Sequence, residues 1–243
     1  DLNPCMVLDP QKRLWLLSTV ILNNRWEAAL LKYRISADYQ QASGPPQWHW
    51  QEVLHCKPGP EFQAVVARDL DRQWASFRRQ ASPEKRKELE PFLVGVRLKS
   101  MSADPLSVRL GWMTRVRPTI LDGERLIVPL YSDGFAFSLM AYTDDWGASW
   151  RFSEPIVGAG NIQPSLARRR DGALVAYFRD GGPPPKRVMV SESKDRGQTW
   201  TPVQDTDLPD PGAGLEALVL ASGRWALVNN DTESGRHSLA VTV

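Results

Sequence analysis

Two copies of one eight-residue motif constrain this chain more than any other feature of its sequence. The motif reads S/T-x-D-x-G-x-S/T-W and occupies residues 143–150 and 193–200. Its hydroxyl and carboxylate side chains can hydrogen-bond backbone amides within a turn, and its glycine permits a positive φ. Its tryptophan supplies a large apolar group that can pack against a sheet. We call this motif an Asp box, and its two copies at this spacing predict a repeat architecture.

Short strand-like runs and turns precede each Asp box in the same order, so the repeating unit is larger than the motif. Each unit holds three or four short strands, with an Asp-Gly or Ser-Gly turn in the later units. This repeated order of short strands and turns is typical of a β-propeller, in which one unit forms one blade. We expect four units, and they cover residues 3–50, 114–150, 162–200 and 215–243.

Two of these units need closer inspection. In the first, Ser36-Ala37-Asp38 begins a degenerate Asp box whose Gly and Trp are displaced by an insertion. Either Trp48 or Trp50 can then supply the tryptophan. In the second unit, we expect a single strand over residues 116–121, before the Asp122-Gly123 turn.

Residues 59–104 interrupt the propeller pattern. Apolar residues recur there at three- and four-residue steps over 62–77, which is the signature of an amphipathic helix. Helical spacing continues over 85–99, although Pro91 should end or kink the second helix. We interpret the segment as a helical insertion between blades. It can serve as a lid or packing arm, or alternatively as a partner-binding or dimerisation element.

The composition excludes several classes of protein. The net charge is +2 and the basic residues are spread along the chain, so nothing predicts a nucleic-acid partner. No run of 18 apolar residues is present, so we expect no membrane span. The oligomeric state stays open. The abrupt start at Asp1 resembles a mature or trimmed product, which favours a periplasmic or secreted location without establishing it.

The cysteines and histidines do not predict a metal or a cofactor. Cys5 and Cys56 are the two cysteines, and we expect two buried thiols, with a disulfide as the alternative. Metal sites need clustered cysteine and histidine side chains. The three histidines, by contrast, are scattered along the sequence. We therefore expect no metal site and no cofactor.

The two Asp boxes, the strand–turn–strand units and their spacing resemble the sialidase (neuraminidase) superfamily, and within it the bacterial proteins with BNR repeat-like domains. The resemblance covers nearly everything except the insertion at 59–104. It implies an all-β fold, a six-bladed β-propeller of which this chain covers about four blades. Residues 1–243 would then form one Asp-box propeller domain that is incomplete at both ends.

The chemistry of that family centres on an arginine triad that clamps the sialic acid carboxylate, a Tyr nucleophile activated by a Glu, and an Asp general acid. Guanidinium groups suit this task because they bind carboxylates bidentately and stay charged. By motif, Arg179 matches the second arginine and Arg236 the third, while the first arginine, the Tyr and the Asp fall outside this chain. Gln163 stands where the family has its Glu. Because glutamine cannot take a proton, the activity is in question while acidic-sugar binding stays plausible.

An alignment of the units with one another gives an independent route to the site. Propeller ligands bind at one end of the central channel, where the innermost strands begin. The alignment brings four residues that begin these strands into one register: Asn3, Arg117, Gln163 and Glu216. The residues that end the second strands form another set: Thr19, Tyr131, Arg179 and Asn230, with Ser132, Asp180 and Asp231 following in the later units. Both sets mix arginine with amide and carboxylate groups, which suits an anion-binding site.

These registers yield the candidate site residues. The candidate substrate-binding residues are Arg117, Gln163, Arg179, Asp180 and Arg236, and the candidate catalytic residue is Glu216. Several alternatives stay open. Arg179 could form a salt bridge with neighbouring carboxylates, Glu216 could pair with an arginine of the site, and either Arg115 or Arg117 should face solvent.

The leading functional hypothesis is a sialidase-like glycoside hydrolase that acts on sialic acid or another acidic glycan. Its partner would be an acidic carbohydrate or glycoconjugate. A non-catalytic carbohydrate-binding or scaffold propeller is the alternative that Gln163 favours. A polysaccharide lyase on a propeller scaffold, which needs a Tyr/His pair at the site, is the third possibility.

Overall fold

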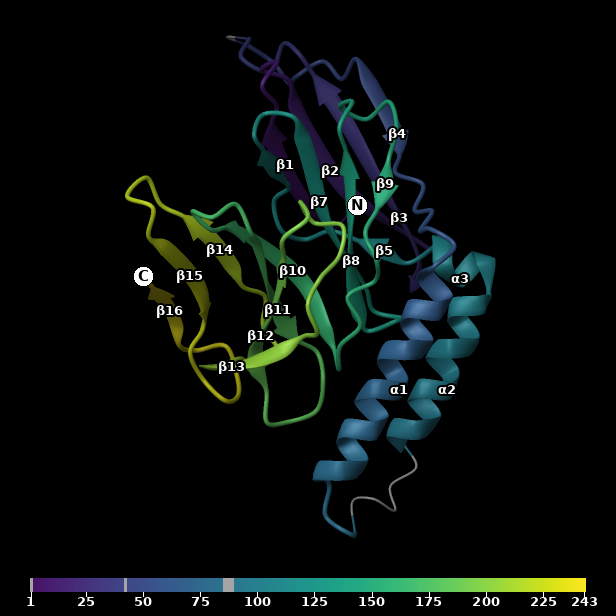
Figure 1. The fold of residues 1–243 in the computed structure, drawn as a ribbon. Coiled ribbons are helices and arrows are strands. Elements are labelled where there is room, and N and C mark those ends of the chain that lie inside the picture. Colours follow the sequence, from purple (N-terminus) through teal and green to yellow (C-terminus); the bar gives the residue numbers. More distant parts are fainter. Residues whose placement is uncertain (1, 42, 85–89) are drawn as a thin grey trace.

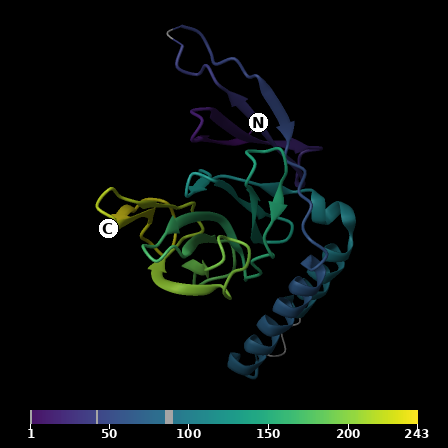
Figure 2. The same cartoon turned by 45° about the horizontal axis from the view of Figure 1, so that its top comes forward.

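A computed structural model shows the chain as four antiparallel sheets, with residues 2–41, 43–84 and 90–243 described. The sheets follow one another along the sequence, from purple through teal and green to yellow in Figure 1, and Figure 2 shows them from a second direction. The first strand of the third sheet contacts strands of both the second and the fourth sheet. The sheets are four blades of a β-propeller, which confirms the fold class expected from the repeats.

Each blade is named by its order in the chain. Blade 1 contains β1 (Leu2–Leu8), β2 (Leu14–Leu22), β3 (Arg25–Ser36) and β4 (Trp50–Val53). Blade 2 contains β5 (Trp112–Met113), β6 (Thr119–Leu121), β7 (Arg125–Ser132), β8 (Phe137–Thr143) and β9 (Arg151–Phe152). Blade 3 contains β10 (Asn161–Arg168), β11 (Leu174–Asp180), β12 (Arg187–Ser193) and β13 (Gln204–Pro209). Blade 4 contains β14 (Glu216–Val219), β15 (Trp225–Asn230) and β16 (Leu239–Thr242).

The first strand of blade 2 is broken, so the expectation of one strand over 116–121 is wrong. β5 and β6 both pair with β7, and the residues between them leave the sheet. Within this break, the hydroxyl of Thr114 donates a hydrogen bond to the carbonyl oxygen of Val116 at 3.2 Å. The local turn replaces ladder hydrogen bonds, and it carries Arg115 and Arg117 out of the regular strand.

The Asp boxes form self-bonded turns, as their side chains predicted. In the first box, the Thr143 hydroxyl donates to Asp145 Oδ1 at 2.7 Å and accepts from the backbone N–H of Gly147 at 2.9 Å. The hydrogen bond from the Ser149 side chain leads the interactions that hold the pKa of Asp145 below its usual value. The box at 193–200 repeats the pattern. These aspartates therefore hold the turns through hydrogen bonds within their own boxes.

Each of these two boxes packs against the blade that precedes its own. In the box of blade 2, Gly147 lies against the Trp15 ring of blade 1. The ring of Trp150 meets Tyr33 of blade 1 edge-on, with centroids 5.8 Å apart. In the box of blade 3, Gly197 lies close to Ile127 of blade 2. An Asp box thus holds two neighbouring blades together as well as closing its own turn.

The degenerate box of blade 1 keeps the turn but lacks the buried tryptophan. The Ser36 hydroxyl donates to Asp38 Oδ1 at 2.7 Å, as in the other two boxes. Trp50, however, lies in β4 and is 52% exposed, and Trp48 is only partly buried. Neither tryptophan is therefore a buried plug. The reason is the insertion that separates both residues from Asp38.

The main hydrophobic core lies between blades 1 and 2 and contains both cysteines as free thiols. This confirms the prediction of buried thiols over the alternative of a disulfide. Burial raises the pKa of Cys5 to about 12 and raises the pKa of Cys56 well above its usual value. Both thiols therefore stay protonated and unreactive near neutral pH.

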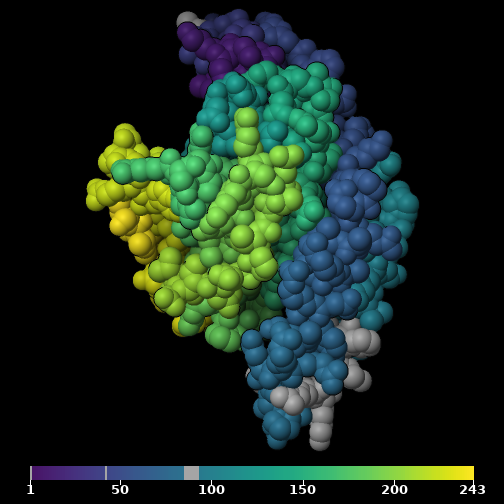
Figure 3. All heavy atoms as spheres, in the orientation of Figure 1, coloured from purple at the N-terminus to yellow at the C-terminus, as the bar shows by residue number. Residues whose placement is uncertain are grey.

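The helical insertion contains α1 (Phe62–Gln80), α2 (Glu90–Ala103) and the short α3 (Pro105–Arg109), which the periodicity did not predict. Residues 85–89, where helical spacing was also expected, fall outside the described residues. Pro91 does not end this helix, because α2 runs through it from Glu90 to Ala103. α1 and α2 form a hairpin that projects from the sheets (Figures 1 and 3).

The hairpin is anchored on blade 2. The Phe62 ring packs edge-on against Phe135 with centroids 5.7 Å apart, and it also contacts Trp112 and Phe137. A guanidinium N–H of Arg97 donates to the carbonyl oxygen of Gly134 at 3.4 Å. None of the described helices is both long and apolar enough to span a membrane.

Candidate functional site

The predicted site residues gather at one end of the propeller, which we call the mouth. Strand register places the start of each first strand beside the end of the second strand of the same blade. In blade 3, Asn161 pairs with Asp180 and Ile162 pairs with Arg179. In blade 4, Glu216 at the start of β14 pairs with Val228 near the end of β15. The Asp boxes follow the third strands and therefore lie at the opposite end.

Tyr131 joins three blades at the mouth. Its phenol oxygen accepts a hydrogen bond from the Asn3 side chain of blade 1 at 3.3 Å. Gln163 of blade 3 lies close enough to the Tyr131 side chain to lower its pKa. Burial is the main reason why the pKa of Tyr131 is raised, so the phenol stays protonated at neutral pH. Tyr131 is therefore placed to orient side chains rather than to act as a nucleophile.

Backbone bulges aim Asn3 and Gln163 at this tyrosine. Their φ values are 49° and 54°, in the left-handed region that residues other than glycine rarely adopt. Each residue lies where the strand register shifts, and each precedes a proline. Such outliers cost energy and cluster at functional sites. The same distortion thus recurs in the first strands of two blades, at the end that carries the candidate site residues.

Buried polar atoms without a protein partner gather at the same end. Within the described ranges, six buried side-chain atoms have no hydrogen-bond partner, and five of them come from the mouth: Thr19 Oγ1, Asn161 Oδ1, Gln163 Oε1, Arg179 Nε and Asn229 Oδ1. The sixth is Trp150 Nε1 in an Asp box. Because buried polar atoms nearly always have partners, this concentration points to a ligand-binding or water-binding surface.

Arg179 has no carboxylate partner in the described part of the chain, so the salt-bridge alternative does not hold for those residues. Its charge acts on Tyr131 and on Asp133, which follows β7. The pKa of Asp133 is raised, chiefly by loss of water around it. Glu27 adds to this rise and Arg179 opposes it. Arg179 thus brings a positive charge to the mouth that no described carboxylate neutralises at close range.

Asp180, which follows Arg179, has a structural role. Its Oδ1 atom accepts from the backbone N–H of Gly182 at 2.7 Å, and Oδ2 accepts from that of Arg187 at 3.1 Å. The side chain is buried beneath the loop it supports. Burial also raises the pKa of this carboxyl. The hydrogen bonds of Asp180 hold the β11–β12 loop in place. That Asp180 contacts a substrate stays a prediction.

Arg117 and Glu216 form an ion pair across the mouth, between blades 2 and 4. Arg117 Nε lies 3.2 Å from Glu216 Oε1. Burial raises the pKa of Glu216, while the charge of Arg117 is the first of several effects that oppose the rise. A carboxyl group with a raised pKa can hold a proton closer to neutral pH, as a general acid requires.

Arg236 lies in the loop between β15 and β16, which begins after Asn230 at the mouth end. Its side chain is exposed, and no ion pair or side-chain hydrogen bond joins it to another described residue. The structure thus places Arg179, Gln163, Arg117 and Glu216 around the mouth, but records no contact between Arg236 and any of them.

Sequence reasoning missed three mouth residues as site candidates. Asn3 and Tyr131 did appear in the aligned registers, but nothing in the sequence showed that they touch. Arg115 lies in the break of blade 2 and lines a shallow pocket of about 360 Å³ with Gly214, Leu215, Glu216, Val228 and Leu239. No group of three or more His, Cys, Asp or Glu side chains in the described ranges is arranged to hold a metal ion.

Comparisons with known proteins agree with the fold and the repeats. The profile of the BNR repeat-like domain family matches residues 95–243, which is more than half of the chain. An anhydrosialidase from Macrobdella decora is 31% identical over 99 residues, which cover 39% of this chain and 13% of that protein.

Solved structures of sialidases share the fold. The Hadza microbial sialidase Hz136 superposes with a TM-score of 0.59 at 16% identity, over 98% of this chain and 42% of that one. The NanB sialidase of Streptococcus pneumoniae gives 0.56 at 16% identity, over 88% and 26%. The Trypanosoma rangeli sialidase bound to 2,3-difluorosialic acid gives 0.55 at 15% identity, over 93% and 33%. The chain spans less than half the length of these relatives, and it belongs to the BNR repeat-like domain family within the sialidase superfamily.

Proposed function

We propose that this chain forms part of the substrate site of a sialidase-type glycoside hydrolase that acts on sialic acid or another acidic glycan. The observation that carries the proposal is Arg179. Its guanidinium lies at the mouth without a described carboxylate partner, and its Nε atom is buried without a hydrogen-bond acceptor. A ligand carboxylate would supply the acceptor that this planar donor set lacks.

The surroundings of Arg179 support a sugar ligand. The unpartnered amide oxygens of Asn161, Gln163 and Asn229 can accept hydrogen bonds from sugar hydroxyls. Two acidic groups have raised pKa values that an arginine of the mouth opposes: Arg117 opposes the rise for Glu216, and Arg179 opposes it for Asp133. The mouth therefore combines a cation for the carboxylate with acceptors for hydroxyls and with carboxyls that can hold a proton.

Glu216 is the proposed proton-transfer group. In its protonated form it would donate to the glycosidic oxygen as the bond to the anomeric carbon breaks, and the resulting carboxylate would be stabilised by Arg117. Gln163 cannot act as an acid or base, so in this proposal it positions the substrate. Hydrolysis needs a second group as nucleophile or base, and the proposal assigns none within this chain.

The experiment is hydrolysis of a fluorogenic α-sialoside by the full-length protein, beside the variants Arg179→Ala and Arg168→Ala. Arg168 is a matched control. It is the last residue of β10, so it lies at the end of blade 3 opposite the mouth, and it pairs with Asp122. We expect turnover by the parent protein, a fall of at least about a hundredfold for Arg179→Ala, and little change for Arg168→Ala. Equal turnover by all three proteins would reject the proposal.

A non-catalytic carbohydrate-binding propeller is the second candidate function, and Gln163 favours it. The residue is buried beside Tyr131, and its amide cannot serve as a general acid or base. Binding of N-acetylneuraminic acid that is lost in Arg179→Ala, without turnover of any sialoside by the parent protein, would select this candidate over the enzyme.

A further inference from the structure

Trp50 is a tryptophan that the propeller leaves on its surface. It begins β4, the outer strand of blade 1, and is 52% exposed. Within the described ranges, Trp26 is the only other tryptophan of comparable exposure, at 44%. The indole N–H of Trp50 donates to the hydroxyl of the buried Tyr33 at 3.5 Å. One edge of the ring is therefore tied to the blade, while much of its apolar surface faces solvent.

A second tryptophan comes to the same place from blade 2. A Cβ atom at Gly147 would lie 3.7 Å from the Tyr33 hydroxyl, so the tip of this Asp box lies beside the oxygen that accepts from Trp50. Trp146 precedes Gly147 in the box. It is only partly buried, and it packs against the core that blades 1 and 2 share. We call the surface formed by Trp50 and Trp146 the aromatic platform.

The fold does not require a tryptophan at either position of the aromatic platform. Trp146 has a φ of 57°, and Arg196 has a φ of 64° at the equivalent position of the other Asp box, so the turn accepts an unrelated side chain there. Trp50 is not a buried plug, because an insertion separates it from Asp38. Two large apolar groups that the fold does not bury, brought together from two blades, indicate a binding surface.

Exposed polar side chains lie next to Trp50 along the chain. Gln47 precedes it, and Gln51 and Glu52 follow it in β4. Glu52 projects from the same face of the strand as Trp50, because the two residues are two positions apart. A neutral sugar matches this combination: its C–H groups form an apolar face that stacks on an aromatic ring, and its hydroxyls bond to amides and carboxylates. A wholly apolar partner would leave these polar groups without hydrogen bonds.

We propose that the aromatic platform binds a neutral hexose residue of a glycan chain. The proposal goes beyond the proposed function, because the platform lies away from the mouth. Trp50 pairs with Ile35, which pairs with Trp15, whereas Thr19 marks the mouth end of the same blade. In Figure 1, β4 lies at the top right of the propeller. The platform holds the sugar by stacking and hydrogen bonding, and no covalent bond forms or breaks there.

The test is an NMR titration of the ¹⁵N-labelled full-length protein with two neutral oligosaccharides, cellotetraose and lacto-N-tetraose. The indole N–H signals of Trp50 and Trp146 should shift saturably with at least one of them. Trp50→Ala should weaken this binding by about fivefold or more, and Trp50→Phe should weaken it less, because an aromatic ring remains. Trp146→Arg should also weaken it and should keep the turn, as Arg196 shows in the other box. This variant carries the test independently of Trp50.

Trp26→Ala is the matched control, since it removes an equally exposed ring at the other end of blade 1 and should leave the affinity unchanged. Three results would overturn the proposal: no saturable shift with either oligosaccharide up to about 10 mM, equal weakening by Trp26→Ala and Trp50→Ala, or shifts confined to mouth residues such as the side-chain amide of Asn3. None of these results depends on turnover of a sialoside, so the proposed function stands or falls separately.

Discussion

The Nε atom of Arg117 lies 3.2 Å from Oε1 of Glu216, and this ion pair joins the broken first strand of blade 2 to the first strand of blade 4. The two residues are 99 positions apart in the sequence. Burial raises the pKa of Glu216, and Arg117 limits the rise. The pair therefore sets the pH at which the candidate proton-transfer group ionises.

Removal of Arg117 should raise the pKa of Glu216 further. In Arg117→Gln, burial still disfavours the carboxylate, while the nearest positive charge is gone. The pKa can be followed by the carboxyl ¹³C shift of Glu216 in an NMR titration. Because the folded-state pKa lies above the unfolded one, ionisation of Glu216 costs stability as the pH rises between the two values. In Arg117→Gln this loss of stability should extend over a wider pH range, because the folded-state pKa of Glu216 is higher. A lower pKa of Glu216 in the variant would contradict the stated effect of Arg117.

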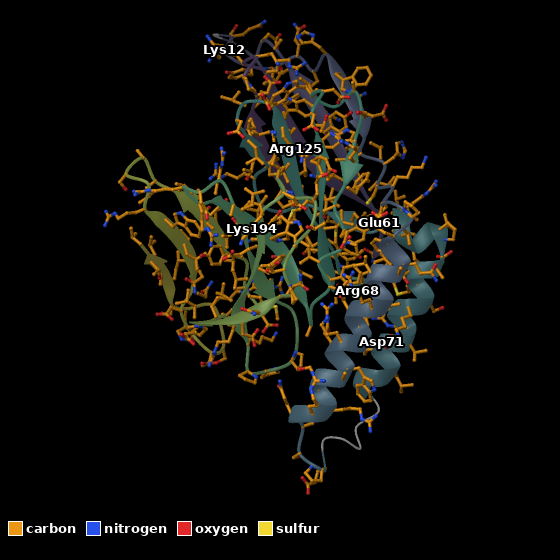
Figure 4. All side chains as sticks on the ribbon, viewed as in Figure 1. Lys12, Glu61, Arg68, Asp71, Arg125 and Lys194 are labelled. Carbon is orange, nitrogen blue, oxygen red and sulfur yellow. The ribbon has the colours of Figure 1, made fainter. Side chains whose placement is uncertain are left out.

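Loss of Arg125 should destabilise the fold at the Asp-box end. Arg125, labelled in Figure 4, makes a bidentate pair with Asp144 at 2.6 and 2.9 Å and also donates to the Arg196 carbonyl oxygen of the next blade. Arg125→Met should lower the free energy of unfolding by about 2–3 kcal/mol, although Asp144 keeps Arg151 as a partner. Chemical denaturation measures this. The exposed pair of Arg168 with Asp122 is the control, and Arg168→Met should cost less than about 1 kcal/mol.

The contact of Gly147 with Trp15 can be separated from the backbone cost of losing a glycine. Gly147 has φ +92°, and a Cβ there would lie 2.9 Å from a ring atom of the fully buried Trp15. Gly44 has φ +85° but open space around it. Each alanine variant should cost about 1–2 kcal/mol for its left-handed backbone. Gly147→Ala should cost about 1–3 kcal/mol more, since the ring has no room to move. Equal melting temperatures for the two variants would show that the blade contact is unimportant.

Tyr131→Phe should loosen the mouth without disturbing the rest of the propeller. The change removes the hydroxyl that accepts a hydrogen bond from Asn3 and that lies beside the buried Gln163 side chain. We expect a loss of about 1–2 kcal/mol in unfolding free energy, together with weaker binding of N-acetylneuraminic acid. Tyr142→Phe is the control. The Tyr142 ring lies beneath Arg125 and Arg151, but its hydroxyl makes no hydrogen bond to a described residue. Sugar binding that survives in Tyr131→Phe would show that Tyr131 does not orient the site.

The sequence by itself determined the repeat and the fold class, and it predicted which end of the propeller carries the candidate site residues. Asp-box chemistry is local: Asp145 bonds within its own turn, so the motif predicts its structure without knowledge of the neighbouring blades. The turns between strands are local as well, and the units can be aligned on their Asp-Gly and Ser-Gly turns. The alignment of Asn3, Gln163 and Glu216 followed from this.

Only the tertiary structure decided which side chains meet. Arg115 and Arg117 have the same side chain and differ by two positions, so no sequence pattern could assign Glu216 to one and Gly214 to the other. The meeting of Asn3, Tyr131 and Gln163 likewise depends on how three blades pack around a common axis. Contacts between blades depend on how all the blades pack together, whereas motifs and periodicities reflect only residues that are near one another in the sequence.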